Sequence, residues 1–89
     1  KVNYPIEKVF VASYDALEDL DLNLVSDDRD KLVATITARN ARGEDIDVDI
    51  KALDDYSSIL TIRVAPFGGE SQAMIIYEDI KERLAAIGR

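Results

Sequence analysis

The sequence predicts an α+β fold in which two helices cover one face of a four-stranded antiparallel sheet. Apolar residues recur every three or four positions near both ends of the chain, as in amphipathic helices. Between these segments they alternate with polar residues, as in half-buried strands separated by short turns. Because each strand has one apolar face, both helices should cover that face. We therefore expect residues 1–89 to form one domain, a two-layer sandwich with the order α-β-β-β-β-α.

The two helices are predicted at residues 5–20 and 70–87. The first should begin at Tyr4-Pro5, because proline fits the first helical position. Its apolar stripe consists of Ile6, Val9, Phe10, Ser13, Leu17 and Leu20. The stripe of the second helix consists of Ala73, Ile76, Tyr77, Ile80, Leu84 and Ile87.

Four alternating segments are predicted as strands. The first is a short strand around Leu22 and Leu24, followed by a turn at SDDRD, residues 26–30. The others are KLVATITAR, DIDVDIKAL and SILTIRV, which begin at residues 31, 45 and 58. The core face of these three strands is predicted to carry Leu32, Ala34, Ile36 and Ala38, then Ile46, Val48, Ile50 and Ala52, then Leu60, Ile62 and Val64.

The register of the strands follows from the requirement that neighbouring strands share one apolar face. The NARG turn should set Arg39 opposite Asp45, and the DDYS turn should set Asp49 opposite Arg63. Each of these cross-strand pairs is expected to form an ion pair, which at an exposed site contributes only about 0.2–1 kcal/mol.

The side of the sheet away from the helices carries a candidate contact surface. Val25, Val33, Leu53 and Ile59 are expected to lie near one another there, with Leu53 opposite Ile59. Exposed apolar residues are common singly, but a cluster of them can bind a partner. The expected role is self-association or contact with a protein partner of unknown identity.

The composition excludes several classes of function. The chain has no cysteine and no histidine, which removes thiolate nucleophiles, the commonest general base and the usual zinc ligands. The formal net charge of −7 opposes binding to nucleic acid. The alternating Asp45, Asp47 and Asp49 resemble the start of an EF-hand loop, but Ile50 and Tyr56 stand where that loop needs glycine and glutamate. We therefore predict no metal, no cofactor and no enzymatic activity.

The segment RVAPFGGES, residues 63–71, lies between the last strand and the second helix. It lacks the lysine of a Walker loop and the spaced glycines and following strand of a dinucleotide-binding loop. Free N–H groups at the helix start could hold an anion, but Glu70 already complements the helix dipole there. We therefore predict a structural corner formed by Arg63, Phe67, Gly68 and Gly69.

Three segments resemble a family of small bacterial lipoproteins known only as a domain of unknown function. They are YPIEKVFVASYDALEDL, LVATITARNARGEDIDVDIKAL and LTIRVAPFGGESQAMIIYEDIKERL, which together cover nearly the whole chain. The matching positions are Tyr4, Pro5, Ile36, Ala38, Gly43, Ile46, Ile62, Arg63, Val64, Phe67, Gly68, Ile76 and Ile80. Ala65 and Gly69 depart from the family pattern, which has glycine and aspartate there, and this weakens any functional role for the corner.

The resemblance implies a secreted precursor with a lipidated cysteine upstream of Lys1, hence a periplasmic or membrane-tethered place on the bacterial cell envelope. It implies no activity. The function expected from the sequence is therefore that of a non-catalytic lipoprotein domain acting in protein interaction or as a structural module. The alternative is a small-molecule or lipid site between the first helix and the sheet. Its wall would hold the aromatic residues Phe10, Tyr14, Phe67 and Tyr77.

Overall fold

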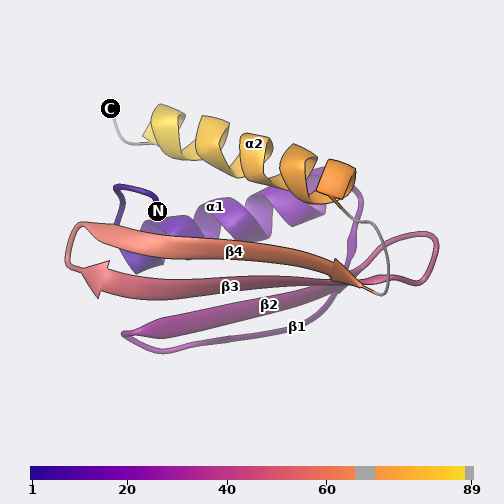
Figure 1. The fold of residues 1–89 in the computed structure, drawn as a ribbon, viewed down its shortest axis with the longest axis horizontal. Helices are drawn as coiled ribbons and strands as arrows, with labels where there is room; N and C mark the ends of the chain where they lie inside the picture. The colour runs from indigo at the N-terminus through magenta and orange to yellow at the C-terminus, as the bar shows by residue number, and fades with distance from the viewer. Residues whose placement is uncertain (66–69, 88–89) are drawn as a thin grey trace.

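The elements follow one another in the predicted order, α-β-β-β-β-α (Figure 1). The computed structural model describes residues 1–65 and 70–87. The elements are α1 (Ile6–Asp19), β1 (Asn23–Arg29), β2 (Val33–Arg39), β3 (Asp45–Asp54), β4 (Ser57–Ala65) and α2 (Glu70–Ile87). The four strands form one antiparallel sheet in the order β1-β2-β3-β4. The predicted α+β meander is confirmed, and Pro5 is the residue before α1 rather than its first residue.

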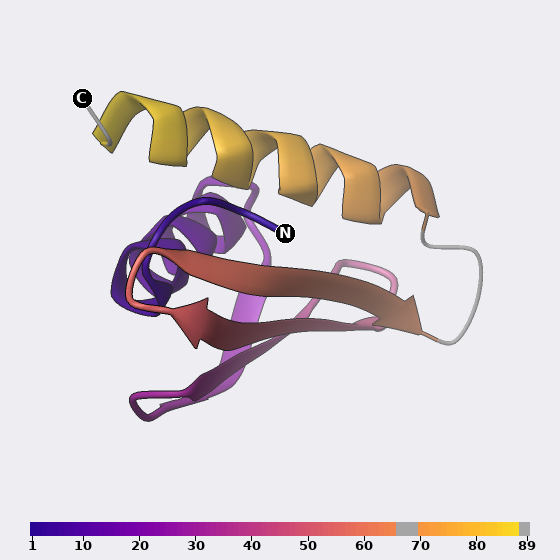
Figure 2. The same ribbon diagram turned by 60° about the vertical axis from the view of Figure 1, so that its left-hand side comes forward.

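The core lies between the sheet and the two helices. Alternate residues of β2 and β3 are fully buried, and α1 lies across all four strands with its apolar stripe against them. In contrast, α2 contacts β4 and α1 but none of the other described strands, so it covers the β4 side of the sheet (Figure 2). Leu32 was expected on the core face, but it lies in the turn before β2 and is exposed.

Strand β1 is longer than predicted and continues through most of SDDRD. Residues 26–29 pair with β2, so the turn falls at residues 30–32 instead. After so short a turn, the odd-numbered residues of β1 lie opposite the even-numbered, core-facing residues of β2. Asp27 lies opposite Ile36 and Arg29 opposite Ala34, so both charged residues are on the core-facing side. A β-bulge at Val25 then restores the parity, which lets Leu24 face the core. The charges are tolerated because β1 is an exposed edge strand.

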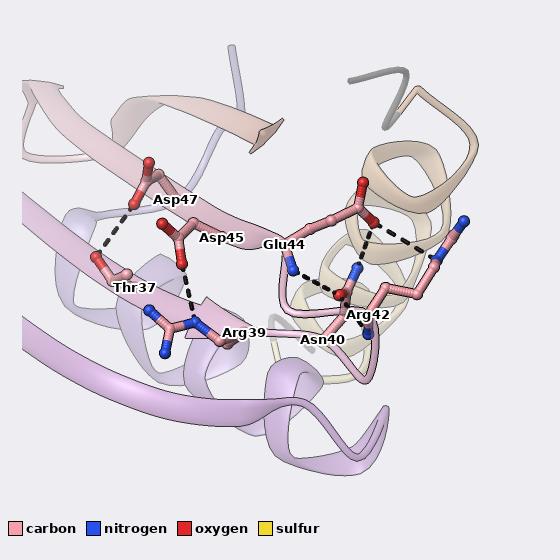
Figure 3. Close-up of polar contacts among 7 residues, drawn as sticks. All are labelled: Thr37, Arg39, Asn40, Arg42, Glu44, Asp45 and Asp47. Atoms are coloured by element: carbon pink, nitrogen blue, oxygen red, sulfur yellow. Dashed lines mark hydrogen bonds and ion pairs between the residues drawn. The ribbon is translucent and has the colours of Figure 1, made fainter. Parts of the chain in front are cut away.

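The hairpin of β2 and β3 has the predicted register. Arg39 lies opposite Asp45, and its Nε donates to Asp45 Oδ1 at 3.1 Å, as Figure 3 shows. Thr37 lies opposite Asp47 and donates to Asp47 Oδ1 at 3.1 Å. The connecting turn is organised by Asn40, whose side chain binds the backbone N–H groups of Arg42 and Glu44 (Figure 3).

The register predicted for β3 and β4 is wrong by two residues. Asp49 lies opposite Thr61 and Lys51 opposite Ile59. The chain turns tightly at Asp55 and Tyr56, which alone would rotate β4 onto the wrong face, and a bulge at Leu53 corrects the rotation. Because the shift is an even number of residues, the predicted core face is kept. Arg63 still reaches Asp49, now diagonally, with Nη2 and Oδ2 2.7 Å apart.

Candidate functional site

The face of the sheet away from the helices is polar along most of its length. Asp side chains of β3 lie there beside Thr and Arg side chains of β2 and β4. The carboxylates of Asp45, Asp47 and Asp49 each accept a hydrogen bond from a side chain of a neighbouring strand. These exposed pairs set the register more than they stabilise the fold. With their oxygens engaged across the strands, the three carboxylates do not converge on one point. Among residues 1–65 and 70–87, no three acidic side chains are grouped so that they could hold a metal ion.

Large exposed apolar side chains gather at one end of the sheet instead. The turns of the β1–β2 and β3–β4 hairpins both lie at this end (Figure 1). Val33 and Ile59 flank Lys51 in one cross-strand row of the open face, and Leu53 lies in the adjacent bulge. We call this group of residues the hairpin-end patch, defined as Leu32, Val33, Leu53, Tyr56 and Ile59. Val33 and Ile59 lie on the open face, whereas Leu32 and Leu53 also line a pocket with Pro5 and Ile6 at the start of α1. The exposed fractions of these residues run from 39% for Ile59 to 79% for Tyr56.

Two aspartates build the turns that present this patch. Asp30 Oδ1 accepts hydrogen bonds from the N–H groups of Leu32 at 2.8 Å and Val33 at 2.9 Å. Asp54 Oδ1 accepts one from Tyr56 N–H at 2.7 Å. In both cases the hydrogen bonds to the backbone hold the pKa of the carboxyl below its ordinary value, because they stabilise the ionised form. Both carboxylates are therefore ionised at neutral pH, where they accept the hydrogen bonds that shape the turns around Leu32 and Tyr56.

The structure brings together three of the four residues predicted for the contact surface. Val33, Leu53 and Ile59 share the hairpin end, but Leu53 is not opposite Ile59. Val25 lies apart from them, because its bulge is opposite Thr37, four residues along β2 and about 13 Å from Val33 at the rise of a strand. The alternation could not reveal Leu32 and Tyr56, which are in turns. The Asx turns formed by Asp30 and Asp54 are the signal that would have found them.

Of the aromatic residues predicted to line a small-molecule pocket, Phe10 and Tyr14 come together and line a pocket of about 280 Å³ between α1 and β1, whereas Tyr77 lies elsewhere. Phe10 and Tyr14 stack at a centroid distance of 6.3 Å on the β1 side of the molecule, where the Arg29 guanidinium lies 4.8 Å from the Phe10 ring centre. Tyr77 is on α2 and lines a groove beside β4, at the other edge of the sheet. Phe67 lies outside the described residues. Between α1 and the sheet, side chains such as Leu17 and Val9 are fully buried against one another.

Of the four residues predicted to form the structural corner, Arg63 is the one among the described residues. Arg63 is in β4 on the open face, where it forms the ion pair with Asp49. Phe67, Gly68 and Gly69 lie outside the described residues. Glu70 begins α2 as predicted. In the part of the chain that the structure describes, neither helix is long and apolar enough to cross a bilayer.

The fold and its surface define a class: a small α+β domain with a meander sheet, both helices on one face and a group of exposed apolar side chains at one end. The family model described as "Protein of unknown function (DUF3568)" matches residues 1–83. The chain belongs to this family. None of the curated proteins matches the chain.

Proposed function

We propose that this domain acts without catalysis, as a protein-interaction module whose contact surface is the hairpin-end patch. The observation that carries the proposal is the gathering of five exposed, large apolar side chains at one end of the sheet. Scattered exposed apolar residues need no explanation, whereas a group of them at one end of a sheet is typical of a contact surface. The rest of the open face is polar, and its Asp side chains accept hydrogen bonds from Thr and Arg side chains of neighbouring strands. The hairpin end is therefore the part of this face that can bury apolar side chains against a partner.

The partner that can be tested directly is a second copy of the chain. Burying the exposed half of five such side chains in each copy contributes on the order of 10 kcal/mol. The loss of translational and rotational freedom opposes association by about 4–15 kcal/mol. With a cost near the lower end of this range, a net gain of about 4–6 kcal/mol remains, so self-association should be weak, with a Kd of roughly tens of µM to 1 mM.

The test is sedimentation velocity of the Val33→Ser/Ile59→Lys variant against the unchanged protein, over that concentration range. Both positions are exposed, so the fold should tolerate the changes within about 1 kcal/mol. We expect the weight-average sedimentation coefficient of the unchanged protein to rise with concentration. The variant should stay monomeric, because a serine and a lysine replace the two apolar residues of the patch that flank Lys51 on the open face.

A matched control carries the same two kinds of change outside the patch. Val25→Ser/Val11→Lys alters two valines of similar exposure, one in β1 and one in α1. This control should associate like the unchanged protein. Equal sedimentation of all three proteins at every concentration would remove the hairpin-end patch as a self-contact. Loss of association in the control alone would move the contact to the surface around Val25 of β1 or Val11 of α1.

The place of the domain on the bacterial cell envelope, as part of a lipoprotein, belongs to the same proposal. It is supported by the resemblance of the segments around Tyr4-Pro5 and Ile62-Arg63-Val64 to the lipoprotein pattern. The coding sequence upstream of Lys1 tests it. A signal peptide ending in a lipobox cysteine is expected there, and a coding sequence without that cysteine would contradict the envelope location.

A further inference from the structure

The outer edge of β4 already accepts one strand-like contact. Val2 N–H donates to the Ser58 carbonyl at 2.8 Å, and Ser58 N–H donates to the Val2 carbonyl at 2.9 Å. In an antiparallel ladder, the backbone groups of alternate residues point to the same side. Those of Leu60, Ile62 and Val64 therefore point outward like those of Ser58. Among the described strands, β4 has β3 as its only neighbour, so these six groups have no strand partner there.

An apolar groove runs beside this edge, between β4 and the first half of α2. It has a volume of about 310 Å³ and is lined by Leu60 and Ile62 of β4 and by Ala73, Met74 and Tyr77 of α2. Glu70, at the start of α2, is the one charged residue among the described lining residues. A strand added to β4 would place every second side chain on the core side of the sheet, in this groove.

The two edges of the sheet are protected differently. Strand β1 carries a bulge at Val25, charged side chains at Asp27 and Arg29 on its core-facing side, and Asp28 on its other side. Bulges and inward charges are devices that prevent strand addition. On β4, the stretch from Ser58 to Ala65 pairs with β3 without a bulge and has no charged residue on its core-facing side. Only β4 therefore presents an edge suited to pairing.

The position of α2 decides what can occupy this edge. If two copies paired β4 against β4 around a twofold axis, both α2 helices would lie on the same side of two adjacent strands (Figure 2). Adjacent strands are about 4.8 Å apart, whereas packed helices need about 8–10 Å between their axes. The helices would collide. The occupant must therefore be an extended segment that has no helix over it.

We propose that the β4 edge and its groove bind an extended peptide segment of a partner protein by strand addition. The segment runs antiparallel to β4, as Val2 does, and places apolar side chains opposite Val64, Ile62 and Leu60. A basic residue at its N-terminal end complements Glu70, in a protein whose net charge is −7. This surface differs from the hairpin-end patch, so either can fail without the other.

The probe is a synthetic peptide, Lys-Thr-Val-Thr-Val-Thr-Val, and the readout is amide hydrogen exchange by NMR in the full chain. At a free peptide concentration of about ten times its Kd, exchange of the Leu60, Ile62 and Val64 amides should slow by about tenfold. The Ser58 amide is already bonded to Val2 and should change little. The same peptide with N-methylated valines keeps its side chains but lacks the three donors, and it should give no protection.

Two neighbouring residues of α2 provide matched variants. Met74 lines the groove and Ile75 does not, although their exposed fractions are 58% and 57%. We expect Met74→Glu to weaken peptide binding by at least about tenfold, as loss of a central contact does. Ile75→Glu should leave the affinity within about twofold. Equal effects of the two variants, absence of binding, or binding without protection of the three amides would each overturn the proposal.

Discussion

Replacement of Ile80 by alanine is expected to lower the free energy of unfolding by about 2–5 kcal/mol. Ile76, Ile80 and Leu84 are spaced by four residues on α2, and all three side chains are essentially fully buried. They are the buried face of a helix that packs on only α1 and β4 among the described elements. Ile80 is the middle residue of this face, so the cavity left by its truncation has packed neighbours on both sides. A small domain has only about 5–15 kcal/mol of total stability.

Urea unfolding followed by circular dichroism measures this loss. Ile75→Ala is the matched control, because Ile75 is on the same helix but mostly exposed. Its effect should stay within about 0.5 kcal/mol. If the two variants had the same midpoint and slope, the burial of the Ile80 face would be wrong, and with it the docking of α2 onto α1 and β4.

Replacement of Asn40 by alanine should have the second largest effect, a loss of about 1–3 kcal/mol. Asn40 Oδ1 accepts hydrogen bonds from the N–H groups of Arg42 and Glu44, both at 3.0 Å. Its Nδ2 donates to Glu44 Oε1 and to Gln72 Oε1, both at 2.9 Å. One side chain thus closes the β2–β3 turn, in which Gly43 has a φ of +81°, and ties that turn to α2.

A double-mutant cycle with Gln72→Ala measures the contribution of the hydrogen bond between Asn40 in the β2–β3 turn and Gln72 in α2. We expect a coupling free energy of about 0.5–1.5 kcal/mol between Asn40 and Gln72, measured by urea unfolding. Arg42→Ala is the control, since the Arg42 side chain is exposed and its contact with Glu44 spans 3.6 Å. Strict additivity of the Asn40 and Gln72 changes would show that the hydrogen bond between them contributes nothing to stability.

The fold followed from the sequence because its signals are periodic. The alternation in residues 45–53 predicted which side of β3 is buried, and Ile46, Val48 and Ile50 are fully buried. The register of β3 and β4 did not follow, because the bulge at Leu53 has no distinctive residue type. An even shift of the register leaves every side chain on its face. Alternation therefore predicts faces, whereas turn geometry decides which residues are opposite one another.

The candidate site was predictable to the extent that it follows the same alternation. Val33 and Ile59 came from their place opposite the core face of their strands. Val25 was wrongly placed because β1 continues through most of SDDRD, so the turn falls at residues 30–32 and Val25 lies far from it. The groove beside β4 could not be predicted at all. It depends on α2 lying over that strand and on Val2 pairing with Ser58, which are contacts between distant parts of the chain.

The central claim, that the hairpin-end patch is the contact surface, is tested most directly by NMR spectra of the unchanged protein at increasing concentration. Methyl and amide signals report contact residue by residue. We expect concentration-dependent shifts at Leu32, Val33 and Ile59, with signals at the other end of the sheet, such as Val25, constant. Shifts confined to Val25 and its neighbours, or spectra unchanged from about 10 µM to 1 mM, would contradict the claim.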